Sequence, residues 1–235
     1  MRGGAARSAT TADRLVGWAT VVAGVVYSAF LVTPLLGTRL PPGRSYVSEL
    51  AALDQPHDLV FRTVDAAVGL VVVAAALHVV RGAGVRAVRW AGAALGLFGV
   101  ATLLDAAAPM ACAPSADPAC AAAEASRSAL AFGAHEVSSV AANGSAILAV
   151  VLLAVARSRG RTASQPASPL EGAMLVGLPL VVVPGLLVVL EETVGLGLDG
   201  IVGYVQRLQI LALSGVLVTI GLVVLRGSRW ARRRA

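Results

Sequence analysis

The chain has 235 residues, of which 57% are hydrophobic and only 14% are charged. Soluble globular domains carry roughly 25% charged residues, so this composition excludes that class and indicates a membrane protein. All 19 basic residues are arginine, and they stand at the ends of apolar segments. Because the positive charge is not gathered on one face of a domain, the net charge of +6 does not indicate nucleic-acid binding.

Six apolar stretches reach the roughly 20 residues that a helix needs to cross a bilayer. They cover residues 15–36, 61–80, 90–110, 130–156, 172–191 and 203–225. The sequence predicts an all-α fold, a six-transmembrane-helix bundle that forms a single membrane domain over residues 1–235. The first stretch is too long for a signal peptide and lacks a cleavage site, so we expect it to remain as a helix.

The arginines predict the orientation of this bundle. Fourteen of them, with only Asp13 and Glu171 as opposing acids, fall on one side and give it a net charge of +12. The other side has five arginines and eleven acids, a net charge of −6. Cytoplasmic loops of membrane proteins carry the excess of basic residues. We therefore expect both termini to be cytoplasmic, in a multi-pass protein of the cytoplasmic (plasma) membrane.

The two cysteines, Cys112 and Cys120, lie in the same predicted outer loop, ACAPSADPAC. The outer side is an oxidising compartment, so two thiols this close in sequence predict a disulfide that closes the loop. Two thiols alone are too few ligands for a structural metal site.

The longest polar interruption of the apolar sequence runs from Ser45 to Asp65, SYVSELAALDQPHDLVFRTVD. At about 1.5 Å per helical residue, Asp65, Asp105, His135 and Arg207 all fall in one layer at the outer ends of the predicted spans. Charged groups at membrane depth usually face a bundle interior or a wet cavity and pair with one another. The sequence therefore predicts an outward-facing polar pocket. The alternative is that these are ordinary boundary residues, with Arg62 and Asp65 forming a local i,i+3 pair.

Two finer expectations concern this layer. His135 heads a polar stripe with Ser139 and Asn143 at i+4 and i+8, which should face the bundle. Arg207 cannot shed its charge, so we expect it to point into the bundle and pair with an acid, with Asp105 as the first choice.

The search for catalytic motifs finds no GxSxG, no HExxH and no P-loop. The three histidines are too scattered for a zinc triad, so neither a metal nor a cofactor is predicted. Ser48, His135 and Asp105 form a possible nucleophile, base and orienting acid. They make a membrane hydrolase of lipid-like substrates the alternative hypothesis.

Several short motifs recur in a familiar order: SELAALDQPHDLVFR before the second span, Asp105 ending the third, a cysteine-containing loop, His135 opening the fourth and GYVQRL opening the sixth. Over residues 15–225 the chain resembles the six-span bacterial and archaeal membrane proteins catalogued as domain of unknown function 998. The resemblance implies family positions at Ser48, Glu49, Arg62, Asp105, His135 and Arg207. It implies no activity.

The leading hypothesis is an integral membrane protein whose outer pocket binds a lipid headgroup, a small ligand or another membrane protein. The candidate binding residues are Ser48, Glu49, Arg62, Asp65, Asp105, His135 and Arg207. Whether the protein is an enzyme stays open. A transporter is disfavoured, because no charged residue falls near the middle of a predicted span and no inverted repeat is visible.

Overall fold

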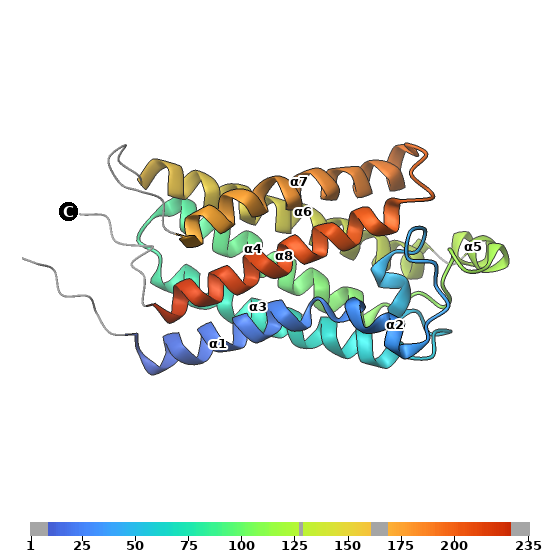
Figure 1. The fold of residues 1–235 in the computed structure, drawn as a ribbon, viewed down its shortest axis with the longest axis horizontal. Helices are drawn as coiled ribbons and strands as arrows, with labels where there is room; N and C mark the ends of the chain where they lie inside the picture. Colours follow the sequence, from blue (N-terminus) through green and yellow to red (C-terminus); the bar gives the residue numbers. More distant parts are fainter. Residues whose placement is uncertain (1–8, 127–128, 161–168, 227–235) are drawn as a thin grey trace, which may run out of the picture.

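A computed structural model describes residues 9–126, 129–160 and 169–226. Its long helices run side by side along one long axis (Figure 1). In chain order the elements are α1 (Thr11–Val26), the 3₁₀ helix η1 (Ala29–Val32), α2 (Thr33–Leu36), the 3₁₀ helix η2 (Val47–Ala51), α3 (Asp58–Gly82), α4 (Arg86–Ala107), α5 (Pro118–Ala125), α6 (Ala129–Gly160), α7 (Pro169–Val194) and α8 (Val202–Leu225). The described residues contain no strand, which confirms the predicted all-α class.

Five helices are long and apolar enough to cross a membrane, and a sixth span is made by α1 together with Ala29–Leu36. The predicted helical membrane bundle is thereby confirmed, with five spanning helices, or six when the bent pair counts as one span. The first span is not one straight helix, however, because its two parts are bent by 42°. Pro34 follows the bend and has no N–H to donate to the carbonyl of Phe30, and the Thr33 hydroxyl donates to that carbonyl at 2.8 Å instead.

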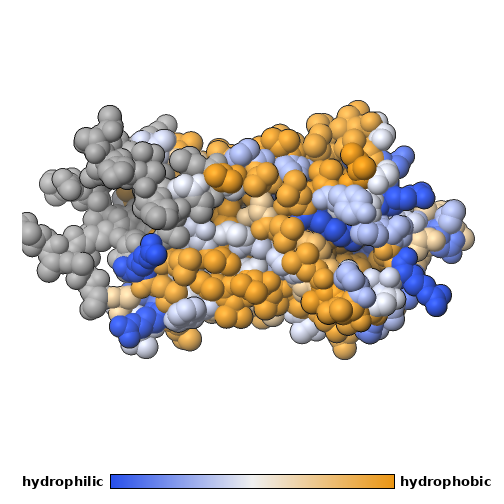
Figure 2. All heavy atoms as spheres, viewed as in Figure 1, coloured by the Kyte–Doolittle hydropathy of each residue, from blue (hydrophilic) through white to orange (hydrophobic). Residues whose placement is uncertain are grey.

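The outer surface of the bundle suits a lipid environment. On α1, the side chains of Leu15, Trp18, Val22 and Val25 are more than half exposed, at the spacing of one helical face. Figure 2 shows hydrophobic residues covering most of the middle of the visible face, with hydrophilic residues gathered toward its ends. An exposed apolar surface of this kind is favourable in a bilayer and unfavourable in water.

Small residues allow the helices to approach closely. A Cβ on Gly69 of α3 would lie 2.8 Å from the carbonyl oxygen of Gly99 on α4, and the reverse distance is also 2.8 Å. On the other side of the bundle, Gly17 of α1 faces Gly221 of α8 in the same way. Such small-residue contacts are typical of membrane helices, whose association depends on close packing. Further packing of α4 on α6 and of α7 on α8 completes the bundle.

The connections divide the bundle into two different ends. α1 begins and α8 ends at one end, on the left in Figure 1, where His78 of α3 contacts Asp13 of α1 at 2.9 Å. The segment before α3, the loop that carries α5 and the turn between α7 and α8 lie at the opposite end. Two of these loops are joined, because the Leu53 N–H donates to the carbonyl of Met110 at 3.0 Å. We call this the loop end of the bundle.

Candidate functional site

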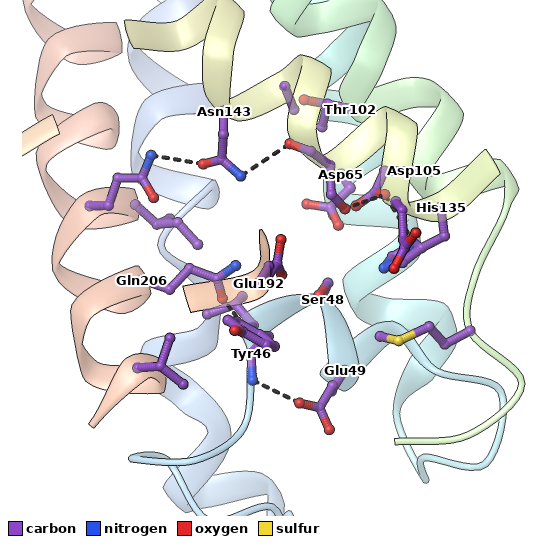
Figure 3. A pocket seen from close by; sticks show the side chains of 18 of the residues that line it. Tyr46, Ser48, Glu49, Asp65, Thr102, Asp105, His135, Asn143, Glu192 and Gln206 are labelled. Carbon is purple, nitrogen blue, oxygen red and sulfur yellow. Dashed lines mark hydrogen bonds and ion pairs between the residues drawn. The ribbon is translucent and has the colours of Figure 1, made fainter. Parts of the chain in front are cut away.

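A cavity of about 490 Å³ opens into the loop end of the bundle (Figure 3). Its wall takes residues from the η2 segment, from α3, α4, α6, α7 and α8, and from the loop before α5. On α6 the lining runs from His135 to Ala146, and on α8 from Val202 to Leu213. Eleven residues of helix rise about 16 Å, so on both helices the cavity reaches well into the span.

Five of the candidate binding residues line this cavity: Ser48, Glu49, Asp65, Asp105 and His135. Arg62 and Arg207 are not among the lining residues. The polar stripe of His135, Ser139 and Asn143 also faces the cavity, as its helical spacing predicts. Residues from four separate parts of the chain therefore meet in one polar space.

Asp105 is the centre of the most closely packed polar group. His135 Nδ1 lies 3.1 Å from Asp105 Oδ1, with the two side chains 15% and 19% exposed. This contact has the distance of an ion pair without the alignment of a hydrogen bond. The hydroxyls of Ser138 and Ser139 donate to the same oxygen at 2.7 and 3.1 Å. Asp105 is thus held by α6, and it lies beside the imidazole of His135.

A second polar chain runs from α6 to α8. Asn143 Nδ2 donates to the carbonyl of Ser139 at 3.0 Å, and Gln209 Nε2 donates to Asn143 Oδ1 at 2.8 Å. Gln209 is only 3% exposed, and its Oε1 has no hydrogen-bond partner among the described residues. Buried polar atoms in proteins nearly always have a partner. This oxygen is one of two such exceptions among the described residues, the other being Nδ1 of His135, and it needs an explanation.

Asp65 faces the cavity with no hydrogen-bond or ion-pair partner in the described part of the chain. The alternative prediction of a local Arg62–Asp65 pair is wrong, because Arg62 turns the other way. Its Nη1 lies 3.6 Å from Asp58, one turn earlier on α3, and its Nε donates to the carbonyl of Ala106 at the end of α4. Since that carbonyl has no helical donor of its own, it draws the guanidinium away from Asp65.

Arg207 does not pair with Asp105, so that prediction is also wrong. Its Nη1 donates to the carbonyls of Pro42 and Ser45, each at 2.7 Å, and to Gly203 at 3.0 Å. Within the described residues the guanidinium has no carboxylate at ion-pair distance. The loop before η2 folds back onto the start of α8, and its carbonyls need donors that the loop backbone does not supply. Arg207 provides those donors and stabilises the loop.

Glu49 is also held by hydrogen bonds within the fold. It is 2% exposed; its Oε1 accepts from the N–H of Tyr46 at 2.9 Å, and its Oε2 accepts from the N–H and the hydroxyl of Ser115 at 2.9 and 2.6 Å. Gln206 of α8 accepts from the N–H of Val47 at 2.6 Å. Glu49 therefore ties the η2 segment to the loop that carries α5, and Gln206 ties it to α8.

Tyr46 stands at the outer part of the cavity, beside Glu49 and Glu192 (Figure 3). Burial raises the pKa of its phenol, and the negative charges of Glu192, Glu191, Glu49 and Asp199 raise that pKa further. Both causes disfavour the phenolate. The hydroxyl of Tyr46 therefore keeps its proton and can donate a hydrogen bond.

The predicted disulfide is confirmed. The sulfur atoms of Cys112 and Cys120 are bonded, with the Cα atoms 5.9 Å apart. The bond closes the loop onto α5, a short helix that the sequence did not predict, whose N-cap Asp117 accepts from the N–H of Ala119. The bonded loop includes Ser115, a partner of Glu49, so the disulfide also restrains one wall of the cavity.

A family model described as Protein of unknown function (DUF998) matches residues 6–223. The chain belongs to this family. No curated protein and no solved structure matches the chain. The function of this family is unknown, so functional conclusions depend on the cavity itself.

The DUF998 chain places seven carboxylates on the cavity wall: Glu49, Asp65, Asp105, Glu136, Glu191, Glu192 and Asp199. Arg44 and His135 are the only basic or imidazole side chains among the described lining residues. Glu191 is occupied by the backbone N–H groups of Leu196 and Leu198. No group of three or more His, Cys, Asp or Glu in the described residues is arranged to hold a metal ion.

Sequence reasoning did not single out Gln209 as a site residue of this DUF998 protein. Its spacing on α8 contains a usable signal, since it is a rare uncharged polar residue one helical turn deeper than Gln206. Polar side chains at that depth usually face other helices. The sequence does not show which atom of the Gln209 amide lacks a hydrogen-bond partner, because that depends on the side chains around it in the folded structure.

Proposed function

We propose that this protein is a multi-pass protein of the cytoplasmic (plasma) membrane whose outer cavity binds a small ligand or a lipid headgroup. The observation that carries the proposal is the buried, unpartnered Oε1 of Gln209, a residue that lines a cavity of about 490 Å³. Leaving a buried acceptor without a partner costs about 1–3 kcal/mol. A ligand that supplies the missing donor would remove that cost when it binds.

The open carboxylate of Asp65 supports the same proposal. Ionisable side chains within membrane spans are costly and usually mark a binding site or a pathway. Glu49, Glu191 and Arg207 are occupied by loop and helix-end backbone groups, whereas Asp65 is not. The distribution of arginines supports an extracytoplasmic position for this end of the bundle. The cavity would then be reached from the extracytoplasmic side or from the outer leaflet.

The proposal is tested by measuring which small molecules and lipids stay bound to the purified protein. The protein would be isolated in mild detergent and its bound small molecules and lipids identified by native mass spectrometry. Ala142→Trp places a large side chain in the cavity lining and should abolish retention. Ala93→Trp, on the exposed face of α4, is the matched control and should leave retention unchanged. Equal retention by the wild type and both variants would contradict the proposal, as would retention of a second membrane protein in place of a small molecule.

A membrane hydrolase is the second candidate, because His135 and Asp105 are in contact and Ser48 lines the same cavity. Nδ1 of His135 is turned toward Asp105, as the base of a catalytic triad is turned toward its acid. The Ser48 hydroxyl, however, has no hydrogen bond to His135, which favours binding over catalysis. A fluorophosphonate probe that labels wild-type protein but not Ser48→Ala would reverse that preference.

A further inference from the structure

We propose that the ligand presents a protonated primary amine to this cavity, recognised by the Asp65 carboxylate and the Gln209 amide oxygen. This inference rests on the proposed function and names the chemical class of the ligand. It is carried by the sign of the charges on the wall and by the orientation of Gln209.

The wall has an excess of negative charge. Seven carboxylates line the cavity against Arg44 and His135. Asp105 and Glu49 are held by hydroxyl and N–H donors, and these contacts neutralise them only in part. An anionic ligand such as a free phosphate would be repelled by this wall, while a cation would be attracted, most strongly where low-dielectric protein surrounds the charge. Asp65 is the deeply placed acid without a partner, so it is the counter-ion that a cationic ligand would meet.

The orientation of the Gln209 amide follows from its neighbours. The carbonyl of Ser139 can only accept, so Asn143 must turn its Nδ2 toward it and its Oδ1 toward Gln209. Gln209 must then donate from Nε2, which leaves Oε1 as the free atom. Turning the amide around would set two oxygen acceptors against each other. The open group at this buried position is therefore an acceptor and requires an N–H or O–H donor from a ligand.

Carboxylate and amide oxygens together select a cation that carries hydrogen-bond donors. A primary ammonium has three N–H groups, whereas a quaternary ammonium has none and is typically bound by open aromatic faces. Three aromatic residues line the cavity, Tyr27, Tyr46 and Phe98. Tyr27 and Phe98 pack edge to face on each other, with ring centroids 5.9 Å apart. They form part of the wall packing and do not present two free faces. The cavity therefore favours a primary amine over a choline-like group.

Two sources share this chemistry: the headgroup of an ethanolamine lipid and a soluble amine. The test uses the full-length protein in nanodiscs of phosphatidylcholine and measures binding by isothermal titration calorimetry. Glycerophosphoethanolamine and glycerophosphocholine are compared, because they differ only in the methylation of the nitrogen. Ethanolamine alone forms the soluble arm, and retention of phosphatidylethanolamine from mixed lipid forms the lipid arm.

We expect glycerophosphoethanolamine to bind the wild type at least ten times more tightly than glycerophosphocholine. Asp65→Asn keeps the shape of the side chain and removes its charge, and it should weaken binding at least tenfold. Asp58→Asn lies two turns earlier on α3, outside the cavity lining, and should change binding less than twofold. Binding of ethanolamine as tightly as of its glycerophosphate ester would identify a soluble amine, and selective retention of phosphatidylethanolamine would identify a lipid.

Equal affinity for the two esters, or binding that Asp65→Asn leaves unchanged, would overturn the amine inference. Failure of every amine to bind would overturn it as well. The comparison of the two esters uses the wild type only, so a variant that fails to fold does not remove the test. Retention of a different molecule that Ala142→Trp abolishes would leave the proposed function standing, so failure of the amine inference is distinguishable from failure of the binding proposal.

Discussion

Replacing Glu49 by Gln should release the loop that carries α5 from the η2 segment. The Glu49 carboxylate is 2% exposed and accepts three hydrogen bonds, one from Tyr46 and two from Ser115. A glutamine keeps one acceptor oxygen and places an NH₂ group where the other oxygen stood. If the oxygen stays on Ser115, the NH₂ group faces the N–H of Tyr46, and two donors then oppose each other.

The expected loss of stability follows from the hydrogen bonds that Glu49→Gln removes. A hydrogen bond to a charged group contributes about 1.5–3 kcal/mol. Glu49→Gln loses the charge and one such bond, so we expect about 2 kcal/mol less stability for the contact between the two segments. Because each 1.4 kcal/mol is a factor of ten, local opening should become roughly 30 times more frequent. Glu49→Ala removes all three bonds and should have the larger effect.

The assay is amide hydrogen exchange followed by mass spectrometry, which reports local opening directly. Peptides that contain Tyr46 or Ser115 should exchange roughly 30 times faster in Glu49→Gln. Peptides from the middle of α3 should be unchanged. The matched control is Glu136→Gln, an exposed carboxylate on the same cavity wall with no partner in the described residues. Equal exchange at both loops in wild type and Glu49→Gln would refute the reasoning that Glu49 joins them.

Four further expectations follow from the structure. Arg207→Met should lower the thermal stability in detergent by about 2–3 kcal/mol, because three carbonyls lose a charged donor; an unchanged melting temperature would contradict this role. Cys112 and Cys120 should resist alkylation until a reductant is added, and Cys112→Ser with Cys120→Ser should speed exchange in α5 without unfolding the bundle; free labelling of both thiols in unreduced membranes would contradict the bond. Gly99→Val should separate α3 from α4, since its Cβ would lie 2.8 Å from a backbone oxygen of the facing helix, and should be measurable as a loss of folded protein in size-exclusion chromatography; a native elution profile would refute the close contact. Reporter fusions at Gly160 and at both termini should report a cytoplasmic location, and an extracytoplasmic signal from Gly160 would overturn the predicted orientation.

Hydropathy sufficed to predict the bundle, because a membrane span depends mainly on the length and composition of one local segment. The disulfide was predictable for a similar reason, since the two cysteines share one short loop. The bend in the first span was missed because the stretch 15–36 is apolar throughout. The break lies between Val26 and Ala29, before the carbonyl of Phe30 that Pro34 leaves without a helical donor.

The layer of polar residues was also visible in the sequence, and Ser48, Asp65, Asp105 and His135 do line one cavity. The partners of the charged side chains could not be predicted from the sequence. Arg207 and Arg62 bind backbone carbonyls at a folded loop and at a helix end, and the spacing of ionisable residues says nothing about where such carbonyls point. Asp65 and Gln209 Oε1 have no hydrogen-bond partner among the described residues, although Arg62 and Asn143, which pair with other groups, stand close to them in the chain or in the fold. Helix depth depends on local sequence, whereas the choice of a hydrogen-bond partner depends on the direction of every neighbouring donor and acceptor, and only the tertiary structure determines those directions.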